Sequence, residues 1–207
     1  MIFDLQGPDR ALAYKLLVNL VIPRPIAWIT SRDLDGGINL APYSFFNVVG
    51  SDPPIVVVGV GNERDGLPKH TARNIAATKD FVVNLVTEDL INQMTISAAD
   101  FPEGESELAA AGLAGAPSSK IATPRVAEAK VALECILHRI DRIGSNNLVI
   151  GQVVAIHTAD GLVDDKLHVN NFLPVARIGG PSGYIRLTDS FQVPRISYAQ
   201  LKTETDG

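Results

Sequence analysis

The 207-residue chain contains one cysteine, Cys135, so it cannot form an intrachain disulfide. It also has no apolar run approaching the about 20 residues that a membrane-spanning helix needs. The amino terminus carries acidic residues early and lacks the basic and then apolar pattern of a secretion signal. These absences predict a cytoplasmic protein that does not enter a membrane.

Dense clusters of lysine and arginine are missing as well, and the net charge is −5. Nucleic acids and anionic membranes both need a positive surface, so neither is expected to be the main partner. A local group of cations can still hold one small anion. Hydrophobic residues make up 46% and charged residues 20% of the chain, as in proteins that bury a core. We expect one domain over residues 1–207.

Common catalytic and metal motifs are absent from the sequence. The segment 56–66 (VVVGVGNERDG) resembles a dinucleotide-binding loop, but Arg64 stands where a third Gly or Ala is required. Cys135 is expected to be a small buried hydrophobic residue and His157 a structural histidine. The histidine spacings match no compact metal motif, and the four residues are His70, His138, His157 and His168.

The hydrophobic pattern predicts a mainly β protein with a few helices. Strands without regular βαβ alternation favour a closed or half-closed antiparallel barrel decorated by helices over a doubly wound parallel sheet. Residues 101–123 form a weakly patterned excursion with a short helix, and 179–207 form an extended tail. Turns are expected at 33–37 and 144–147, helices at 8–17, 70–78 and 89–99, and strands at 26–30, 38–41, 44–50, 55–60, 81–86, 131–143 and 148–158.

Residues 24–47 (RPIAWITSRDLDGGINLAPYSFFN) are expected to form two strands joined by a tight turn, with a kink at Pro42. Small and hydroxyl side chains near this kink suit the polar edge of a flat heterocycle, and Phe45 and Phe46 can wall a face. Composition alone favours the simpler alternative, an ordinary hairpin with a hydrophobic core. The small and polar residues concerned are Thr30, Ser31, Asn39, Ala41 and Ser44.

Residues 69–74 (KHTARN) begin a predicted helix with three basic side chains and a hydroxyl. Cations at a helix amino terminus are unfavourable unless an anion is bound there, because free N–H groups already make that end positive. Thr71 can donate to a phosphate oxygen, and Lys69 and Arg73 can balance its charge. A threonine cap with solvated basic side chains remains the alternative.

Four segments in this order resemble the flavin reductase-like family of FMN-binding split barrels, which includes flavoredoxins and reductase components of two-component monooxygenases. The segments are RPIAWITS, GxNxAPYSFFN, DPPxVVV and KHTxxNI with DFVVNL after it. The late segment 176–196 resembles the family's carboxy-terminal pattern. His70 stands where the family often has Asp, and Ile178 replaces a Leu before Gly-Gly.

The resemblance implies a homodimer with FMN near the subunit interface and an FMN-binding split β-barrel fold. It places the Thr30–Ser31 turn and Asn39, Leu40 and Ala41 along the isoalloxazine and ribityl chain, with the 44–47 segment along the same cofactor. The implied cofactor-binding residues are Ser44, Phe45, Phe46 and Asn47 in that segment, and Lys69, Thr71 and Arg73 at the phosphate.

The implied activity is reduction of flavin by NADH or NADPH, with hydride transfer to flavin N5 and no catalytic side chain required. Reduced flavin would then reach a partner oxygenase. Two alternatives stay open, a flavoredoxin-like electron carrier with tightly bound FMN that serves a redox partner protein, and a non-catalytic dimeric flavin-binding protein. The sequence shows no residue that distinguishes NADH from NADPH.

Overall fold

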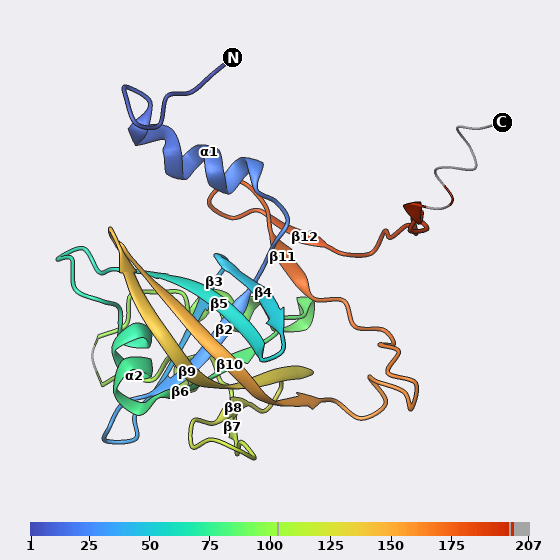
Figure 1. The fold of residues 1–207 in the computed structure, drawn as a ribbon. Coiled ribbons are helices and arrows are strands. Elements are labelled where there is room, and N and C mark those ends of the chain that lie inside the picture. The colour runs from blue at the N-terminus through green and yellow to red at the C-terminus, as the bar shows by residue number, and fades with distance from the viewer. Residues whose placement is uncertain (103, 199, 201–207) are drawn as a thin grey trace.

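The computed structural model describes residues 1–102, 104–198 and 200 (Figure 1). Its main element is a seven-stranded sheet in the order β3-β2-β6-β9-β10-β5-β4, in which every neighbouring pair is antiparallel. The sheet curls on itself in Figure 1, as expected for a half-closed barrel. Its strands are β2 (Ala27–Arg32), β3 (Ile38–Tyr43), β4 (Phe46–Ser51), β5 (Pro54–Gly61), β6 (Asp80–Asn84), β9 (Val131–Ile143) and β10 (Asn146–Thr158).

Short elements surround this sheet. There are two small antiparallel sheets among the described residues. One consists of β1 (Arg24–Pro25), β11 (Val175–Arg177) and β12 (Tyr184–Arg186), and the other of β7 (Gly115–Ala116) and β8 (Arg125–Val126). The α-helices are α1 (Ala13–Leu20), α2 (His70–Thr78), α3 (Ile91–Ile96) and α4 (Glu107–Ala110), and the 3-10 helices are η1 (Arg10–Leu12) and η2 (Glu88–Leu90). In the described residues, no helix is long and apolar enough to span a bilayer.

The long hairpin of β9 and β10 confirms the strand predicted at 131–143 and shifts the turn that follows it. Asn146 pairs with Ile143, so the connection is confined to Gly144 and Ser145. The predicted four-residue turn at 144–147 was therefore too long. Gly144 has a φ of 59°, a conformation that glycine adopts without a steric penalty.

The predictions for residues 24–47 need two corrections. Thr30 and Ser31 do not form a turn but lie within β2, where they pair with Leu40 and Asn39. Strand β3 continues through Pro42 instead of ending at a kink there. Proline is tolerated because β3 is an edge strand of the sheet, where one side needs no N–H donors. The turn predicted at 33–37 is confirmed by hydrogen bonds to the Asp33 carboxylate.

Two hydrophobic clusters lie on opposite faces of β2, because successive strand residues point to opposite sides. Ile29 packs inside the barrel with Phe81 and Ile75 of α2. Trp28 packs on the outer face with Met94 of α3, and its Nε1 donates to Ser97 Oγ at 2.8 Å. Cys135 is fully buried in the barrel core, as predicted.

Candidate functional site

Two adjoining cavities lie beside the edge strand β3, with volumes of about 220 and 260 Å³. They share Pro42, Tyr43 and Ala98, so they form one elongated depression, which we call the β3 groove. Its first part lies between β3, α2 and the segment after α3, and its second part reaches β11 and β12. The other lining residues are Asn39, Ala41, Glu63, Lys69, His70, Thr71, Ser97, Ala99, Asp100, Phe101 and Glu107 in the first part, and Ile26, Ser44, Met94, Arg177, Pro181 and Tyr184 in the second.

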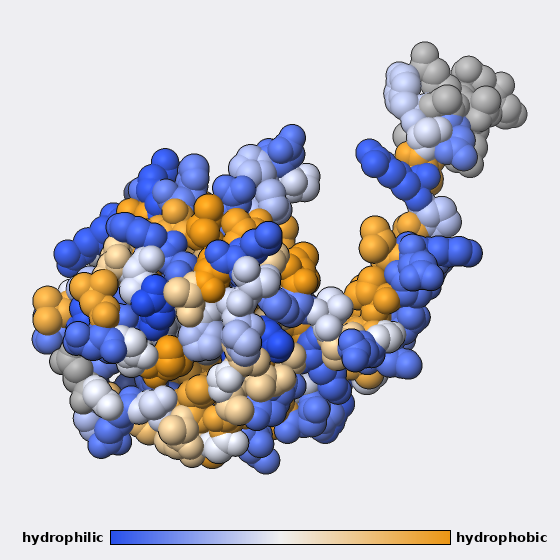
Figure 2. All heavy atoms as spheres, turned by 90° about the horizontal axis from the view of Figure 1, so that it is seen from below, coloured by the Kyte–Doolittle hydropathy of each residue, from blue (hydrophilic) through white to orange (hydrophobic). Residues whose placement is uncertain are grey.

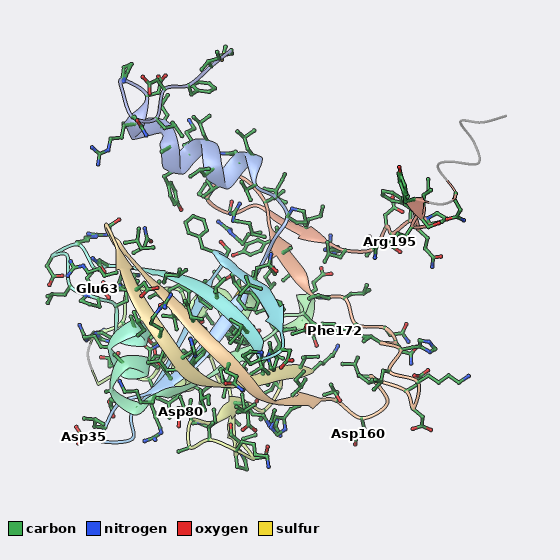
Figure 3. All side chains as sticks on the ribbon, in the orientation of Figure 1. Asp35, Glu63, Asp80, Asp160, Phe172 and Arg195 are labelled. Atoms are coloured by element: carbon green, nitrogen blue, oxygen red, sulfur yellow. The ribbon has the colours of Figure 1, made fainter. Side chains whose placement is uncertain are left out.

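The amino terminus of α2 opens into the first part of the groove. Helix α2 begins at His70, as predicted, and no described side chain caps its first turn. Uncapped N–H groups and the helix dipole favour an anion at this end. Lys69 and His70 line the same wall. Glu63, labelled in Figure 3, contributes a carboxylate from the loop after β5, so the pocket carries charges of both signs.

The Thr71 hydroxyl is the centre of a buried hydrogen-bond network in this part of the groove. Tyr43 donates its hydroxyl proton to Thr71 Oγ1 at 2.9 Å, and the Asn39 side chain lies 2.9 Å from the same oxygen. Burial raises the pKa of Tyr43 to about 12, although the hydrogen bond to Thr71 acts in the opposite direction. Tyr43 therefore stays a neutral donor at neutral pH.

Glu107 of α4 reaches the same network from the excursion predicted at 101–123. Only 7% of its surface is exposed, and its Oε2 accepts a hydrogen bond from the backbone N–H of Leu40 at 3.0 Å. Burial raises its pKa, and the hydrogen bonds from its own backbone N–H and that of Leu40, together with the nearby His70, only partly counter this. The excursion thus contributes a carboxyl group to the groove.

The far end of the groove combines a cation with an aromatic ring. The Arg177 guanidinium lies 4.7 Å from the centre of the Tyr184 ring, within the range of a cation–π contact. Its Nη2 donates to the carbonyls of Gly180 and Pro181, both at 3.2 Å. These acceptors are neutral, so the contacts leave the positive charge of Arg177 unbalanced.

The structure brings five of the predicted cofactor residues together in the groove and places the others elsewhere. Thr30, Ser31 and Leu40 have fully buried side chains. Phe46 and Asn47 line another, more apolar cavity, which borders the groove at Ile26, and Arg73 lines a small neighbouring pocket. Phe45 packs near Tyr14. The five residues in the groove are Asn39, Ala41, Ser44, Lys69 and Thr71.

Sequence reasoning did not select several groove residues. Tyr43 lay inside the APYSFFN motif and could have been found there, because every second residue of β3 shares a face. No sequence pattern indicated a role for Glu107, since it lies in the least patterned part of the chain. Arg177 and Tyr184 fall in the late segment of the family resemblance. What brings Arg177 next to β1 is the long-range strand pairing of Arg24 with Arg177.

The family model described as "Flavin reductase like domain" matches residues 19–173. The chain belongs to this family. Nitrilotriacetate monooxygenase component B from Bacillus cereus has a similar structure, with a TM-score of 0.88, 33% identity, and coverage of 93% of this chain and 98% of that one. The structure of 2-nitrobenzoate 2-nitroreductase from Pseudomonas fluorescens is also similar, with a TM-score of 0.85, 36% identity, and coverage of 96% of this chain and 98% of that one.

A sequence relative of this flavin reductase-like protein carries a more specific name. NADH:riboflavin 5'-phosphate oxidoreductase from Streptomyces pristinaespiralis is 31% identical over 112 residues, which cover 54% of this chain and 58% of that one. The fold is the split barrel of flavin-binding oxidoreductases, which confirms the predicted family and fold class.

The β3 groove fits a flavin mononucleotide in size and in chemistry. Together the two cavities have the volume of typical ligand pockets, about 300–1,000 Å³. One end offers an uncapped helix terminus, Lys69 and the Thr71 hydroxyl, all suited to a phosphate. The other end offers apolar walls and Tyr184, which suit a conjugated ring.

Proposed function

We propose that this protein binds FMN in the β3 groove and uses it to accept electrons from NADH or NADPH. The observation that carries the proposal is the uncapped start of α2, with Lys69, His70 and Thr71 facing one end of an elongated groove. With the phosphate at this end, the isoalloxazine ring would lie at the apolar end, near Met94 and Tyr184.

Bound FMN would supply the electron-accepting chemistry, and the protein would supply position and electrostatics. Lys69 and the first-turn N–H groups of α2 would hold the phosphate, and Thr71 would orient it. Tyr184 would support the ring face, and the charge of Arg177 would favour an anionic reduced ring. The name of the Streptomyces pristinaespiralis relative supports a nicotinamide donor.

We further propose a homodimer, because many large apolar side chains of the described residues are exposed. Helix α1 stands away from the barrel in Figure 1 and buries only Val18. A helix of eight residues is not stable in water on its own. Hydrophobic residues are also exposed along the extended segment after β12 (Figure 2), which includes Phe191 and Val193. A second copy of the chain would cover these surfaces.

Light scattering during gel filtration tests the dimer. A mass of twice 22.1 kDa is expected, and a mass of 22.1 kDa at micromolar concentration would contradict it. The similarity to a monooxygenase component B supports a partner oxygenase as the acceptor of reduced flavin. A cytoplasmic location stays a prediction.

The test of the proposed function begins with flavin-free protein titrated with FMN, followed by anaerobic addition of NADH and NADPH in separate samples. Rapid bleaching of the flavin absorbance by either donor is expected. Bleaching by a chemical reductant alone would instead support a flavoredoxin-like electron carrier. A protein that never binds FMN would refute the proposal.

A matched pair of variants in α2 tests the phosphate end. Thr71→Val removes the groove hydroxyl and is expected to weaken FMN binding about tenfold, or ~1.4 kcal/mol. Riboflavin, which lacks the phosphate, should bind both forms equally. Thr78→Val is the control, since the Thr78 hydroxyl donates to the Asn74 carbonyl at the other end of the same helix. Equal loss in both variants would argue against a phosphate at Thr71.

A further inference from the structure

Four polar groups form a continuous buried chain between the groove and α4. It runs from the Tyr43 hydroxyl through the Thr71 hydroxyl and the Asn39 carboxamide to the Glu107 carboxyl group. Asn39 is 9% exposed, Thr71 1% and Glu107 7%, so these groups must satisfy one another with little help from water. The backbone N–H of Leu40 adds a fixed donor to Glu107 Oε2.

The Asn39 carboxamide can be turned in two ways that reverse the direction of the hydrogen bonds, and with an ionised Glu107 only one of them pairs each of its donors with an acceptor. In one orientation its Nδ2 donates to Glu107 Oε1 at 3.1 Å, and its Oδ1 accepts from Thr71 Oγ1 at 2.9 Å and from the Leu40 N–H at 3.2 Å. In the other orientation Nδ2 donates to Thr71 Oγ1 at 2.9 Å, and Oδ1 faces the Glu107 carboxyl group.

The Leu40 N–H favours the first orientation, and the charge of Glu107 either adds to this preference or opposes it. An ionised carboxylate only accepts hydrogen bonds, so it requires the Asn39 amide group to face it. Thr71 then donates its hydroxyl proton to Asn39 and cannot donate a hydrogen bond to a ligand in the groove. A neutral Glu107 can donate to Asn39 Oδ1, which turns Nδ2 toward Thr71. Thr71 then accepts from Asn39 and Tyr43, and its own proton is free to reach an anion.

We propose that Glu107 is a positioning residue that sets the direction of this hydrogen-bond chain, so that a phosphate monoester bound at Thr71 brings with it the uptake of one proton by Glu107. The proton comes from solvent and stays on Oε1, and no covalent bond to the ligand forms. The inference rests on the proposed FMN site. It adds a way to distinguish FMN from riboflavin, because a flavin without phosphate does not require a hydrogen bond from Thr71.

The surroundings of Glu107 are consistent with a carboxyl group that is easily protonated. Burial raises its pKa, and the charge of His70 lowers it only in part. A phosphate dianion nearby would raise this pKa further, since a second negative charge disfavours ionisation. The other charged groups lining the two pockets that Glu107 borders are Glu63, Lys69 and Asp100 in the groove, and Asp33, Arg73 and Glu105 in the neighbouring pocket.

The experiment is calorimetric titration of flavin-free protein with FMN and, separately, with riboflavin. Each titration is repeated in buffers of different ionisation enthalpy, which gives the number of protons taken up on binding. Glu107→Gln is the key variant, because a glutamine amide donates to Asn39 at every pH while its oxygen still accepts from Leu40. The phosphate of FMN also titrates near pH 6, and subtracting the variant from the wild type removes that contribution.

We expect the wild type to take up more protons with FMN than Glu107→Gln does, and no such difference with riboflavin. Above the pKa of Glu107, FMN affinity of the wild type should fall by up to about tenfold per pH unit relative to the variant. Equal proton uptake by two proteins that both bind FMN would overturn the inference. Failure of the wild type to bind FMN at any pH would instead refute the proposed function.

A second measurement covers the case in which Glu107→Gln does not fold. Infrared difference spectra of the wild type with and without FMN should show the carbonyl stretch of a newly protonated carboxylic acid. The same band should be absent with riboflavin and strongly reduced in Thr71→Val, which cannot redirect a hydroxyl proton. An FMN-induced spectrum without this band would overturn the inference.

Discussion

Glu107 and Glu134 are both buried carboxyl groups that join residues 101–123 to the large sheet, but the two receive very different hydrogen-bond support. Glu134 in β9 accepts from the backbone N–H groups of Ser119 and Lys120, at 2.6 and 2.7 Å, and from the Ser119 hydroxyl at 2.9 Å. His157 contacts it as well, which confirms the structural role predicted for this histidine. The backbone donors to Glu107 are its own N–H and that of Leu40.

The pKa values of the two groups are displaced in opposite directions as a result. Burial alone would raise the pKa of Glu134, but the Ser119, His157 and Lys120 donors together lower it to about 2. With fewer donors, burial dominates at Glu107 and its pKa is raised. Depth of burial therefore does not decide whether a carboxyl group is charged, because the number of donors facing it does. We infer that Glu134 is a fixed anchor and Glu107 an adjustable group.

The largest expected effect comes from removing the anchor. Glu134→Ala leaves the Ser119 and Lys120 donors buried without an acceptor and should lower the free energy of unfolding by about 3 kcal/mol. Urea denaturation followed by tryptophan fluorescence measures this, since Trp28 is the only tryptophan. Glu88→Ala is the control, because its ion pair with Arg186 is exposed and its loss should leave the unfolding midpoint unchanged. Similar losses in both variants would remove the distinction between anchor and surface pair.

A pH series should separate the two glutamates by the sign of their contributions. Between about pH 2 and 4.5 the unfolded chain binds the Glu134 proton more tightly than the folded chain does. The stability of the wild type relative to Glu134→Gln should therefore rise with pH across this window, by about 2–3 kcal/mol. The folded chain instead retains the Glu107 proton above pH 4.5, so stability relative to Glu107→Gln should fall as the pH rises past that value. Slopes of the same sign would contradict the comparison.

The smallest effect concerns one of the donors to Glu134. Ser119→Ala removes the hydroxyl that donates to Oε1 but keeps the backbone N–H, so a loss of about 1 kcal/mol is expected in the same urea assay. Ser190→Ala, in the exposed segment after β12, is the matched control and should have no effect. A loss as large as that of Glu134→Ala would mean that the backbone donors contribute little.

Much of the fold could be predicted from the sequence because its signals are local. The strand at 131–143 and the helix at 70–78 were predicted with the bounds that the structure shows. One error lies at the helix predicted at 8–17, whose α-helical part is Ala13–Leu20. Others fell where neighbouring strands decide the outcome: Thr30 and Ser31 lie within β2, and Pro42 is tolerated because β3 is an edge strand. Local propensity carries no information on edge positions.

Only part of the candidate site could be predicted in the same way. The basic start of α2 was visible in the KHTARN motif because a helix terminus and its charges are adjacent in sequence, whereas the lack of a side-chain cap came from the structure. Phe46 and Asn47 were assigned to the same site from their motif, whereas the structure places them around a different cavity. Whether they contact a flavin, as the resemblance implies, stays a prediction.

The sequence by itself determined the family, the barrel strands and the basic helix start, since each rests on short motifs or patterns that are local in the chain. The tertiary structure alone decided that Glu107, in the least patterned segment, meets Asn39 and Thr71, and that Arg177 lies at the far end of the same groove. The physical reason is sequence separation. Contacts between residues 68 positions apart, such as Asn39 and Glu107, leave no periodic or compositional trace, and form only when the folded sheet and the excursion pack together.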